Sequence, residues 1–391
     1  MLYSHDTYGL GHLRRSRTIA SALAAGLPDA SALIVTGSPI AGRFDFPPRV
    51  DHVRLPGVVK HADGSYTASN LTLDIDKMAA LRGAVIEAAA REFAPQVLIV
   101  DKEPWGLRHE LAPTLALLKA AGVRIVLGVR DVLDDIETLA PEWARKDAAT
   151  AVERYYDEIW VYGLPQICCP LDGLGLSTRM QARTVYTGYL RRDLPDWPAE
   201  AEGDMPEEPY LLVTTGGGGD GAALVDWVIS AYEHDPQLSP PAYIVYGPFL
   251  SNAARADFDA RIAALGGRVS AIGFTPRLER LMDRAWGVVA MGGYNTFCEI
   301  LSADRPAILA PRTKPRREQI IRAEAAERMG LLRMLTPERD GACPSVMAKA
   351  IRALTDQPRP SEATTLAFLD GLGTIVGRAT GLMTPLAAAG E

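Results

Sequence analysis

The stretch MGGYNTFCEILSADRPAILAPRTKPRREQ, residues 291–319, decides the fold. Its order is the end of an apolar strand, a glycine turn, the opening of a helix, and then a second strand with a basic loop. Gly292 and Gly293 let the backbone turn tightly and approach a ligand. The amides of Asn295 and Thr296 then lie at a helix N-terminus, where unpaired N–H groups and the helix dipole favour anions. The stretch therefore predicts a phosphate site.

An acidic residue follows at helical spacing. Glu299 lies four residues after Asn295, so the two share a face of the predicted helix, one turn apart. A carboxylate at that position can accept hydrogen bonds from ribose hydroxyls, which predicts that diphosphate and ribose are bound together. The alternative is structural: the two glycines end a buried strand, and Glu299 is a solvated residue favoured by the helix dipole.

A second glycine turn occurs in YLLVTTGGGGDGAALVDWVI, residues 210–229. Residues 210–215 form an apolar, strand-like run, residues 216–219 form the turn, and helical spacing resumes at residue 222. No acidic residue closes a neighbouring strand at the spacing expected for an NAD ribose, which gives a dinucleotide site little support. The chain also lacks G-x-x-x-x-G-K-[ST], which argues against a P-loop NTPase.

The third glycine turn opens the chain, in MLYSHDTYGLGHLRRS. A short strand precedes it, and His12 follows Gly11 where the first helix is expected to begin. A histidine at this place could act as a general base on a hydroxyl group. The alternative is a helix residue that hydrogen-bonds a neighbouring loop.

Together these segments resemble GT-B glycosyltransferases. They are similar to the N-acetylglucosaminyltransferases that form lipid II in peptidoglycan synthesis, and most similar to a group of predicted bacterial glycosyltransferases related to those enzymes, with a family 28-like C-terminal domain. The resemblance spans most of the chain and rests on GLGHLRRS, VYTGYLRR, LLVTTGGGGDG, GFTPRLERLM, MGGYNTFCEI and EQIIRAEAAERMG. It implies an α/β protein with two Rossmann-like domains, each with a doubly wound parallel sheet, that face each other across a cleft.

The resemblance also implies roles for individual donor-side residues. Phe274 and Thr275 match the pair that frames a uracil base, and Glu299 matches the ribose-binding acid. Glu318 and Gln319 stand where the relatives present two glutamines to the sugar, so the glutamate leaves the donor sugar open. The donor-binding set is Gly216, Gly217, Gly218, Gly219, Phe274, Thr275, Gly292, Gly293, Tyr294, Asn295, Thr296, Glu299, Glu318 and Gln319.

The acceptor side is assigned to the first domain. His12 matches the histidine that lies near the acceptor and the transferred sugar, and it is the candidate catalytic base. Two aspartates end predicted strands: Asp101 as a second acid or base or a loop-fixing residue, and Asp131 as an acceptor contact or a loop-fixing residue. The acceptor-side set is Gly11, Arg14, Arg15, Asp101 and Asp131.

One acidic pair has a metal-binding spacing. Asp74 and Asp76 form a D-x-D, which metal-dependent glycosyltransferases of another fold use to hold a nucleotide diphosphate. Here the pair enters a predicted helix in TLDIDKMAAL, and an aspartate at a helix start is favoured as a cap. We therefore predict capping and no metal site.

Composition limits the class of protein. A chain of 391 residues suits two domains, and the 48% apolar and 23% charged content is typical of globular proteins. A net charge of −7 argues against a nucleic-acid partner. Four cysteines without C-x-x-C spacing indicate neither a zinc site nor a disulfide framework. No apolar run reaches the ~20 residues of a membrane span and no signal peptide precedes the first motif, so we expect a cytoplasmic protein, at the inner face of the membrane if its acceptor is there.

Strand-like and helical segments alternate in both halves, which predicts two parallel sheets. The predicted strands are 32–37, 52–55, 96–101, 124–130, 158–163 and 184–188, then 210–215, 242–247, 268–273, 286–291 and 306–310. The resulting division is an acceptor domain over 1–192, a Pro-rich acidic linker over 193–209, a nucleotide-sugar domain over 210–361, and a C-terminal helix within 362–391 that packs back on the first domain.

The resulting prediction is a hexosyltransferase without cofactor or metal. A UDP-sugar would donate its sugar to an acceptor hydroxyl with His12 as base, and the acceptor would be an anionic glycan or a lipid-linked molecule. Arg14, Arg15 and Arg17 beside His12 motivate the anionic acceptor, although a charge run can also be a solvated helix face. Two alternatives stay open: a nonhydrolysing UDP-sugar epimerase, and a catalytically silent nucleotide-sugar-binding protein.

Overall fold

The computed structural model describes residues 1–5, 11–61, 65–194, 205–207, 209–217, 219–275, 277–363 and 367–383. The chain divides into two compact units. The first unit comprises Met1–Pro165, Cys169–Leu190 and Asp370–Glu391, and the second comprises Gln166–Cys168 and Arg191–Leu369. Gly218 and most of the predicted linker lie outside the described residues.

The first unit is built on a seven-stranded sheet in the order β3-β2-β1-β6-β7-β8-β9. Every paired strand in it runs parallel to its neighbours. The strands are β1 (Leu2–Ser4), β2 (Ala32–Thr36), β3 (Val50–Arg54), β6 (Val97–Asp101), β7 (Arg124–Arg130), β8 (Glu158–Tyr162) and β9 (Thr184–Tyr186). The parallel sheet predicted for the first half is confirmed.

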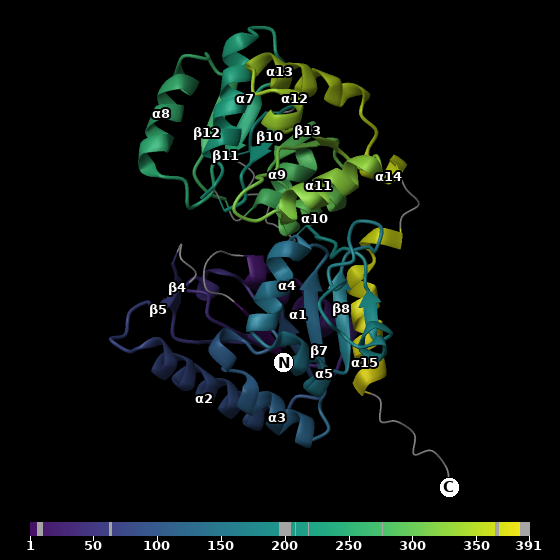
Figure 1. The fold of residues 1–391 in the computed structure, drawn as a ribbon. Coiled ribbons are helices and arrows are strands. Elements are labelled where there is room, and N and C mark those ends of the chain that lie inside the picture. The colour runs from purple at the N-terminus through teal and green to yellow at the C-terminus, as the bar shows by residue number, and fades with distance from the viewer. Residues whose placement is uncertain are drawn as a thin grey trace. The chain divides into compact units, whose positions relative to one another are not determined.

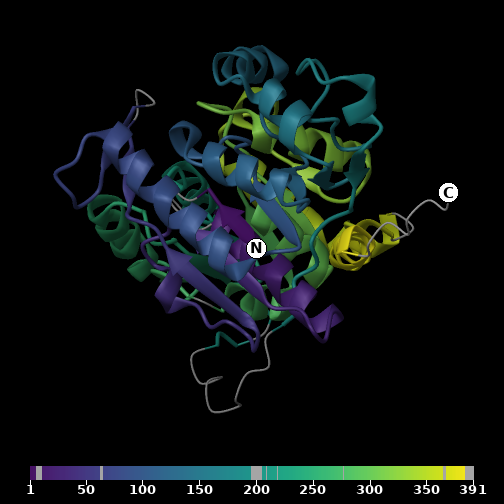
Figure 2. The same ribbon diagram turned by 90° about the horizontal axis from the view of Figure 1, so that it is seen from below.

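Helices cover both faces of this sheet. They are α1 (Gly11–Gly26), α2 (Ile75–Phe93), α3 (Ala112–Ala120), α4 (Ile136–Arg145), α5 (Ala148–Tyr155), α6 (Thr178–Gln181) and α15 (Gly371–Met383). Ile86 of α2, Leu115 of α3 and Val152 of α5 join Leu98 and Val100 of β6 in one core. On the other face α15 packs against α1 and β6 (Figures 1 and 2).

The C-terminal helix α15 is part of the first unit through close packing and one ion pair. Gly26 at the end of α1 comes so near to α15 that a Cβ there would lie 2.7 Å from Cγ1 of Val376. Arg378 of α15 pairs with Glu158 of β8, and the Nε of Arg378 donates to Oε2 at 3.2 Å. None of the described helices has the length and apolarity that a membrane span requires.

A small hairpin and a capped helix complete the first unit. The antiparallel strands β4 (Val58–Lys60) and β5 (Tyr66–Ala68), which the sequence did not predict, contact α2. Asp74 caps α2, because its side chain accepts a hydrogen bond from the Lys77 amide at 2.8 Å. Asp76 accepts from Nε of Arg108 at 2.7 Å. The predicted capping role of the D-x-D is confirmed.

The second unit repeats the architecture with a six-stranded parallel sheet in the order β12-β11-β10-β13-β14-β15. The strands are β10 (Leu211–Thr214), β11 (Ala242–Val245), β12 (Val269–Ile272), β13 (Gly287–Ala290), β14 (Ala307–Leu309) and β15 (Arg333–Met334). The parallel sheet predicted for the second half is confirmed, and β15 is an addition at its edge.

The helices of the second unit also lie on both faces of their sheet. They are α7 (Ala222–His234), α8 (Asn252–Ala263), α9 (Leu278–Arg284), α10 (Tyr294–Ala303), α11 (Glu318–Arg328), α12 (Pro337–Asp340), α13 (Pro344–Arg352) and α14 (Pro360–Ala363). Val228 of α7, Phe258 of α8 and Ile351 of α13 form one core with Val213 and Ile244 of the sheet. The turns that carry the candidate site lie at the carboxyl ends of the strands, where parallel α/β sheets bind ligands.

A buried ion pair ties α2 to the loop after β6. Arg82 donates from Nε to Oε2 of Glu110 at 2.6 Å and from Nη2 to Oε1 at 2.9 Å. The Tyr3 hydroxyl donates to Oε1 of Glu110 at 2.6 Å, and Arg82 also donates to the Pro56 carbonyl at 2.7 Å. The side chains of Arg82 and Glu110 are 1% and 0% exposed, so each charge depends on the other for compensation.

We expect Glu110→Ala to lower the free energy of unfolding by about 3 to 5 kcal/mol, because it leaves the guanidinium of Arg82 buried without a counter-ion. Urea denaturation followed by circular dichroism measures the loss. The double change Arg82→Met with Glu110→Leu replaces both charges by apolar groups and should recover much of it. A loss below about 1 kcal/mol for Glu110→Ala would show that water or another group compensates Arg82.

Candidate functional site

The first half-site pairs a histidine with an aspartate. His12 lies in the first turn of α1, and Asp101 is the last residue of β6, the neighbour of β1 in the sheet. Nδ1 of His12 hydrogen-bonds Oδ2 of Asp101. Arg15, one turn further along α1, donates to both oxygens of Asp101 from Nη2, at 2.6 and 2.7 Å, and to Oδ1 from Nε at 3.0 Å.

The contact with Asp101 selects the tautomer of the histidine. Burial raises the pKa of Asp101, but the charge of Arg15 and the contact with His12 outweigh it and hold that pKa well below its ordinary value. Ionised Asp101 can only accept hydrogen bonds, so Nδ1 of His12 must carry the proton in their contact. In the tautomer that this contact selects, Nε2 of His12 carries the lone pair that a general base needs. The side chain of His12 is 21% exposed.

A second histidine, which the sequence analysis did not single out, lies beside His12. The rings of His5 and His12 are 6.0 Å apart and meet edge to face at 83°. Burial lowers the pKa of His5 to about 3, so this ring is neutral over the physiological range. His5, which directly follows β1, therefore adds an uncharged aromatic ring beside His12.

Other predicted acceptor-side residues have different surroundings. Gly11 begins α1 and is half-buried. Arg14 is half-buried, while Arg17 lies over the ring of Phe44 at 5.2 Å. Asp131 is fully buried, and it accepts from the Tyr189 hydroxyl at 2.7 Å and from the Val132 amide at 2.8 Å. Of the two predicted roles of Asp131, this geometry favours fixing a loop over contacting the acceptor.

The second half-site is the start of α10. Gly292 has a φ of +78°, and a Cβ there would lie 2.7 Å from Leu309, so the turn requires glycine. Gly293 is the N-cap, and nothing lies within 4 Å of the position of its missing Cβ. Asn295 is half-buried and Thr296 is buried in the first turn. The predicted helix start is confirmed, because α10 begins at Tyr294 directly after the two glycines.

The inner side of this helix start is held by a buried arginine. Arg322 of α11 is 0% exposed and donates from Nη1 to the Gly292 carbonyl at 3.0 Å. Its guanidinium lies 5.7 Å from the ring centre of Tyr294, which is buried. The ring of Tyr294 therefore packs against Arg322 at the start of the helix. Glu299, one turn in, is only 2% exposed.

The glycine loop after β10 lies next to the first turn of α10. Gly216 has a φ of +67°, and its missing Cβ would lie 3.7 Å from the hydroxyl of Thr296. The carbonyl of Gly217 accepts from the Phe249 amide at 3.0 Å, which ties the loop to the turn after β11. Gly217 and Gly219 are exposed, and Gly218 lies outside the described residues.

Two arginines lie at this edge: Arg312, from the basic segment after β14, and Arg192, which the sequence analysis did not single out. Arg192 donates from Nη2 to Oδ1 of Asn295 at 2.8 Å, and its amide donates to the Ser302 hydroxyl at 2.9 Å. Arg312 pairs with Asp220 of the glycine loop and, at 2.6 Å, with Oε1 of Glu318. The sequence signal for Arg192 was the pair of arginines in VYTGYLRR, which lies about a hundred residues from α10 in the chain.

The remaining donor-side residues lie on two turns. Phe274 follows β12 and is 51% exposed, and the Thr275 hydroxyl accepts from the Arg277 amide at 3.0 Å. Glu318 and Gln319 are buried at the start of α11. Oε1 of Gln319 accepts from the Arg312 amide at 3.1 Å. All of these turns follow strands of one parallel sheet and share its carboxyl edge.

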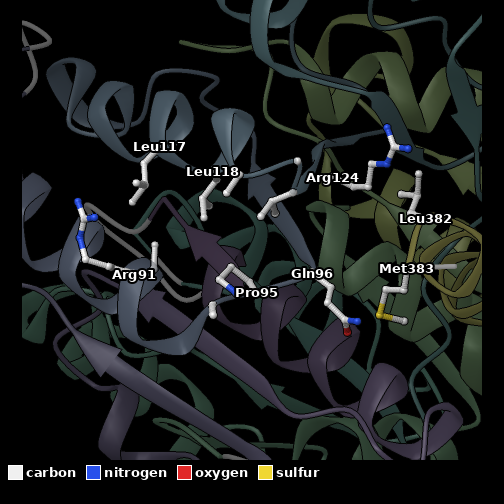
Figure 3. A pocket seen from close by; sticks show the side chains of 13 residues that line it. Arg91, Pro95, Gln96, Leu117, Leu118, Arg124, Leu382 and Met383 are labelled. Carbon is white, nitrogen blue, oxygen red and sulfur yellow. The ribbon is translucent and has the colours of Figure 1, made fainter. Parts of the chain in front are cut away.

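A pocket of about 550 Å³ lies elsewhere in the first unit (Figure 3). Its wall includes Pro95 and Gln96 before β6, Arg124 at the start of β7, and Leu382 and Met383 of α15. These residues lie at the amino ends of the strands, whereas His12 and Asp101 lie at the carboxyl end. The pocket is therefore separate from the candidate catalytic residues.

No protein-family model matches the chain, and no curated protein matches its sequence. Solved structures do resemble it over nearly the whole length. The spinosyn forosaminyltransferase SpnP has a TM-score of 0.64 at 12% identity and covers 98% of both chains. A UDP-glucosyltransferase from Polygonum tinctorium that glucosylates indoxyl has 0.63 at 14% identity, with 98% of both chains covered. MurG of Acinetobacter baumannii has 0.59 at 11% identity, with 97% of this chain and 98% of that chain covered.

These similarities establish the fold. Two Rossmann-like domains with parallel sheets, matched over nearly the whole chain by glycosyltransferases of the GT-B type, confirm the fold class that the sequence predicted. The MurG structure scores no higher than the two glycosyltransferases of other substrates. The structural comparison therefore does not favour the lipid II-forming enzymes over glycosyltransferases that act on other substrates.

We expect Asp101→Asn to lower the free energy of unfolding by about 3 to 5 kcal/mol at pH 7, because it leaves Arg15 buried without its counter-ion. Because the folded pKa of Asp101 is depressed, its contribution is full above the unfolded pKa of about 3.9 and is lost as pH falls through the folded pKa. Urea denaturation at a series of pH values from neutral to strongly acidic measures this. Asp76→Asn, at an exposed ion pair, is the control. A pH-independent difference between wild type and Asp101→Asn would contradict the assignment.

Proposed function

We propose that the protein is a glycosyltransferase that moves a hexose from a nucleoside-diphosphate sugar, a UDP-sugar, to an acceptor hydroxyl. The observation that carries the proposal is the contact between His12 and ionised Asp101, which leaves Nε2 of the histidine as a base. A helix start, a glycine loop and Arg192 in the second unit supply the matching anion site. The glycosyltransferase folds of the structural relatives support the same reading.

The reaction is a displacement at the anomeric carbon. Nε2 of His12 takes the proton of the acceptor hydroxyl, whose oxygen forms the new bond to that carbon. The bond from the anomeric carbon to the diphosphate oxygen breaks, and the nucleoside diphosphate leaves with the electron pair. Asp101 stabilises the imidazolium that forms, as the acid of a catalytic pair does.

The developing charge on the leaving group is met by groups that are already in place. The first amides of α10, the glycine loop and the guanidinium of Arg192 present positive dipoles and charge. Such preorganised donors stabilise a leaving diphosphate without a bound cation, so we propose a metal-independent reaction without a cofactor. Glu299 would bind the ribose, Phe274 and Thr275 would frame the base, and Glu318 with Gln319 would face the sugar.

The acceptor is proposed by its chemical class. The basic residues Arg14, Arg15 and Arg17 lie in the same helix as His12; Arg15 pairs with Asp101, and Arg17 lies over the ring of Phe44. We propose an anionic glycan or a lipid-linked acceptor, which would bring the protein to the inner face of the membrane.

Incubation of the protein with single UDP-sugars, with and without a cell extract as acceptor source, tests the function. A glycosyltransferase consumes donor and releases UDP only when an acceptor is present. Interconversion of the UDP-sugar without acceptor would identify an epimerase instead. Binding of UDP-sugars without any conversion would identify a nucleotide-sugar-binding protein.

His12→Ala should reduce kcat by about 10² to 10⁴, the usual contribution of a general base, and should leave the Kd of UDP unchanged. Steady-state kinetics and calorimetry give the two quantities. His61→Ala removes an exposed histidine of the same unit and serves as the control. Turnover of His12→Ala at the parent rate would mean that another group is the base.

Glu299→Gln should weaken UDP binding by about 1.5 to 3 kcal/mol, because an amide cannot replace a carboxylate as acceptor for two ribose hydroxyls. Calorimetry with UDP measures the change, and a thermal melt verifies the fold. Glu338→Gln, at an exposed position of α12, is the matched control. If UDP binds both variants with the same Kd, Glu299 does not contact the ribose.

A further inference from the structure

An arginine of α8 lies beside the end of β12, against an aromatic ring and a glycine. Arg255, in the first turn of α8, places its guanidinium 5.8 Å from the ring centre of Tyr246. A Cβ on Gly273 would lie 3.1 Å from Nη1 and 3.3 Å from Nη2 of Arg255. The Tyr246 hydroxyl donates to Asp259 at 2.8 Å, which fixes the ring. The guanidinium thus lies against the backbone just before Phe274.

The charge of Arg255 has no counter-ion within the described part of the chain. Its side chain makes no ion pair or hydrogen bond there, and the buried Nε has no acceptor. Arg261 of the same helix shows the usual arrangement, with bonds to Asp226, Glu233 and Ser230. A cation in the first turn of a helix is also disfavoured by the helix dipole. The contact with Tyr246 accounts for the packing of Arg255, but it leaves the hydrogen-bond donors of the guanidinium without an acceptor in the described part of the chain.

The sheet order places Arg255 at a definite distance from the phosphate half-site. β12 lies two strands from β10, whose glycine loop adjoins the start of α10. Neighbouring strands are about 4.8 Å apart, so the end of β12 lies about 10 Å from the glycine loop across the sheet. A ribose bridges a distance of this order between a diphosphate and its base. The exposed rings of Phe249 and Phe274 flank the same edge.

We propose that Arg255 reads the nucleobase of the donor by donating a hydrogen bond to the C4 carbonyl oxygen of uracil. This rests on the proposed function, in which the second unit binds a nucleoside diphosphate. A guanidinium has only donors, so it complements a carbonyl oxygen and opposes an amino group at the same position. Uracil has a carbonyl oxygen at C4, whereas cytosine has an amino group there. Arg255 is thus a specificity-determining residue that favours UDP over CDP.

The test is calorimetric titration of the full chain with UDP and with CDP. Wild type should bind UDP at least about tenfold more tightly than CDP, the discrimination expected of one good base contact. Arg255→Met should raise the Kd of UDP by about the same factor and leave that of CDP nearly unchanged. Arg255→Lys keeps the charge without the planar fork and should recover only part of the preference.

Controls separate the possible outcomes. Arg261→Met, on the same helix, should keep the ratio of the two Kd values, and thermal melts verify that each variant folds. An equal loss of UDP and CDP affinity in Arg255→Met, or no loss, would overturn the assignment. Failure of wild type to bind either nucleotide would instead remove the proposed function, and the role of Arg255 with it.

Discussion

Parallel pairing of the strands in both large sheets is the constraint on which the candidate site depends. When neighbouring strands run in the same direction, every turn that leads from a strand into a helix lies at one edge. β1 and β6 are neighbours, so His12 after the first meets Asp101 at the end of the second. β10 and β13 are neighbours, so the glycine loop meets the first turn of α10. Each half-site is a consequence of strand order.

Charges within each half-site are placed by partners from distant parts of the chain. Arg15 fixes the carboxylate of Asp101, which in turn determines the tautomer of His12. Arg192 holds the side chain of Asn295 at the start of α10. A group held in this way needs little reorganisation when a ligand or a developing charge arrives, which is the property that electrostatic catalysis requires.

The sequence predicted the elements that have a strong local signal. Apolar runs located the main strands, and Gly-Gly located the start of α10. Turns and periodic burial can be predicted in this way because a few neighbouring residues determine them. The hairpin β4–β5 and the two-residue β15 were missed because such short strands carry no period. The contacts of Asp101 with His12 and of Arg192 with Asn295 span 89 and 103 residues, and a single sequence carries no signal for pairs so far apart.

The last helix of the chain completes the first unit, because α15 packs on α1 and pairs with β8. The second unit lies between them in the sequence. During translation the ribosome therefore releases all of Arg191–Leu369 before the segment that covers α1 becomes available. The first unit, although it is made first, must wait with one face of its sheet incompletely covered, while the second can fold as soon as it emerges. Chaperone demand in the cell should thus fall on the earlier-made half.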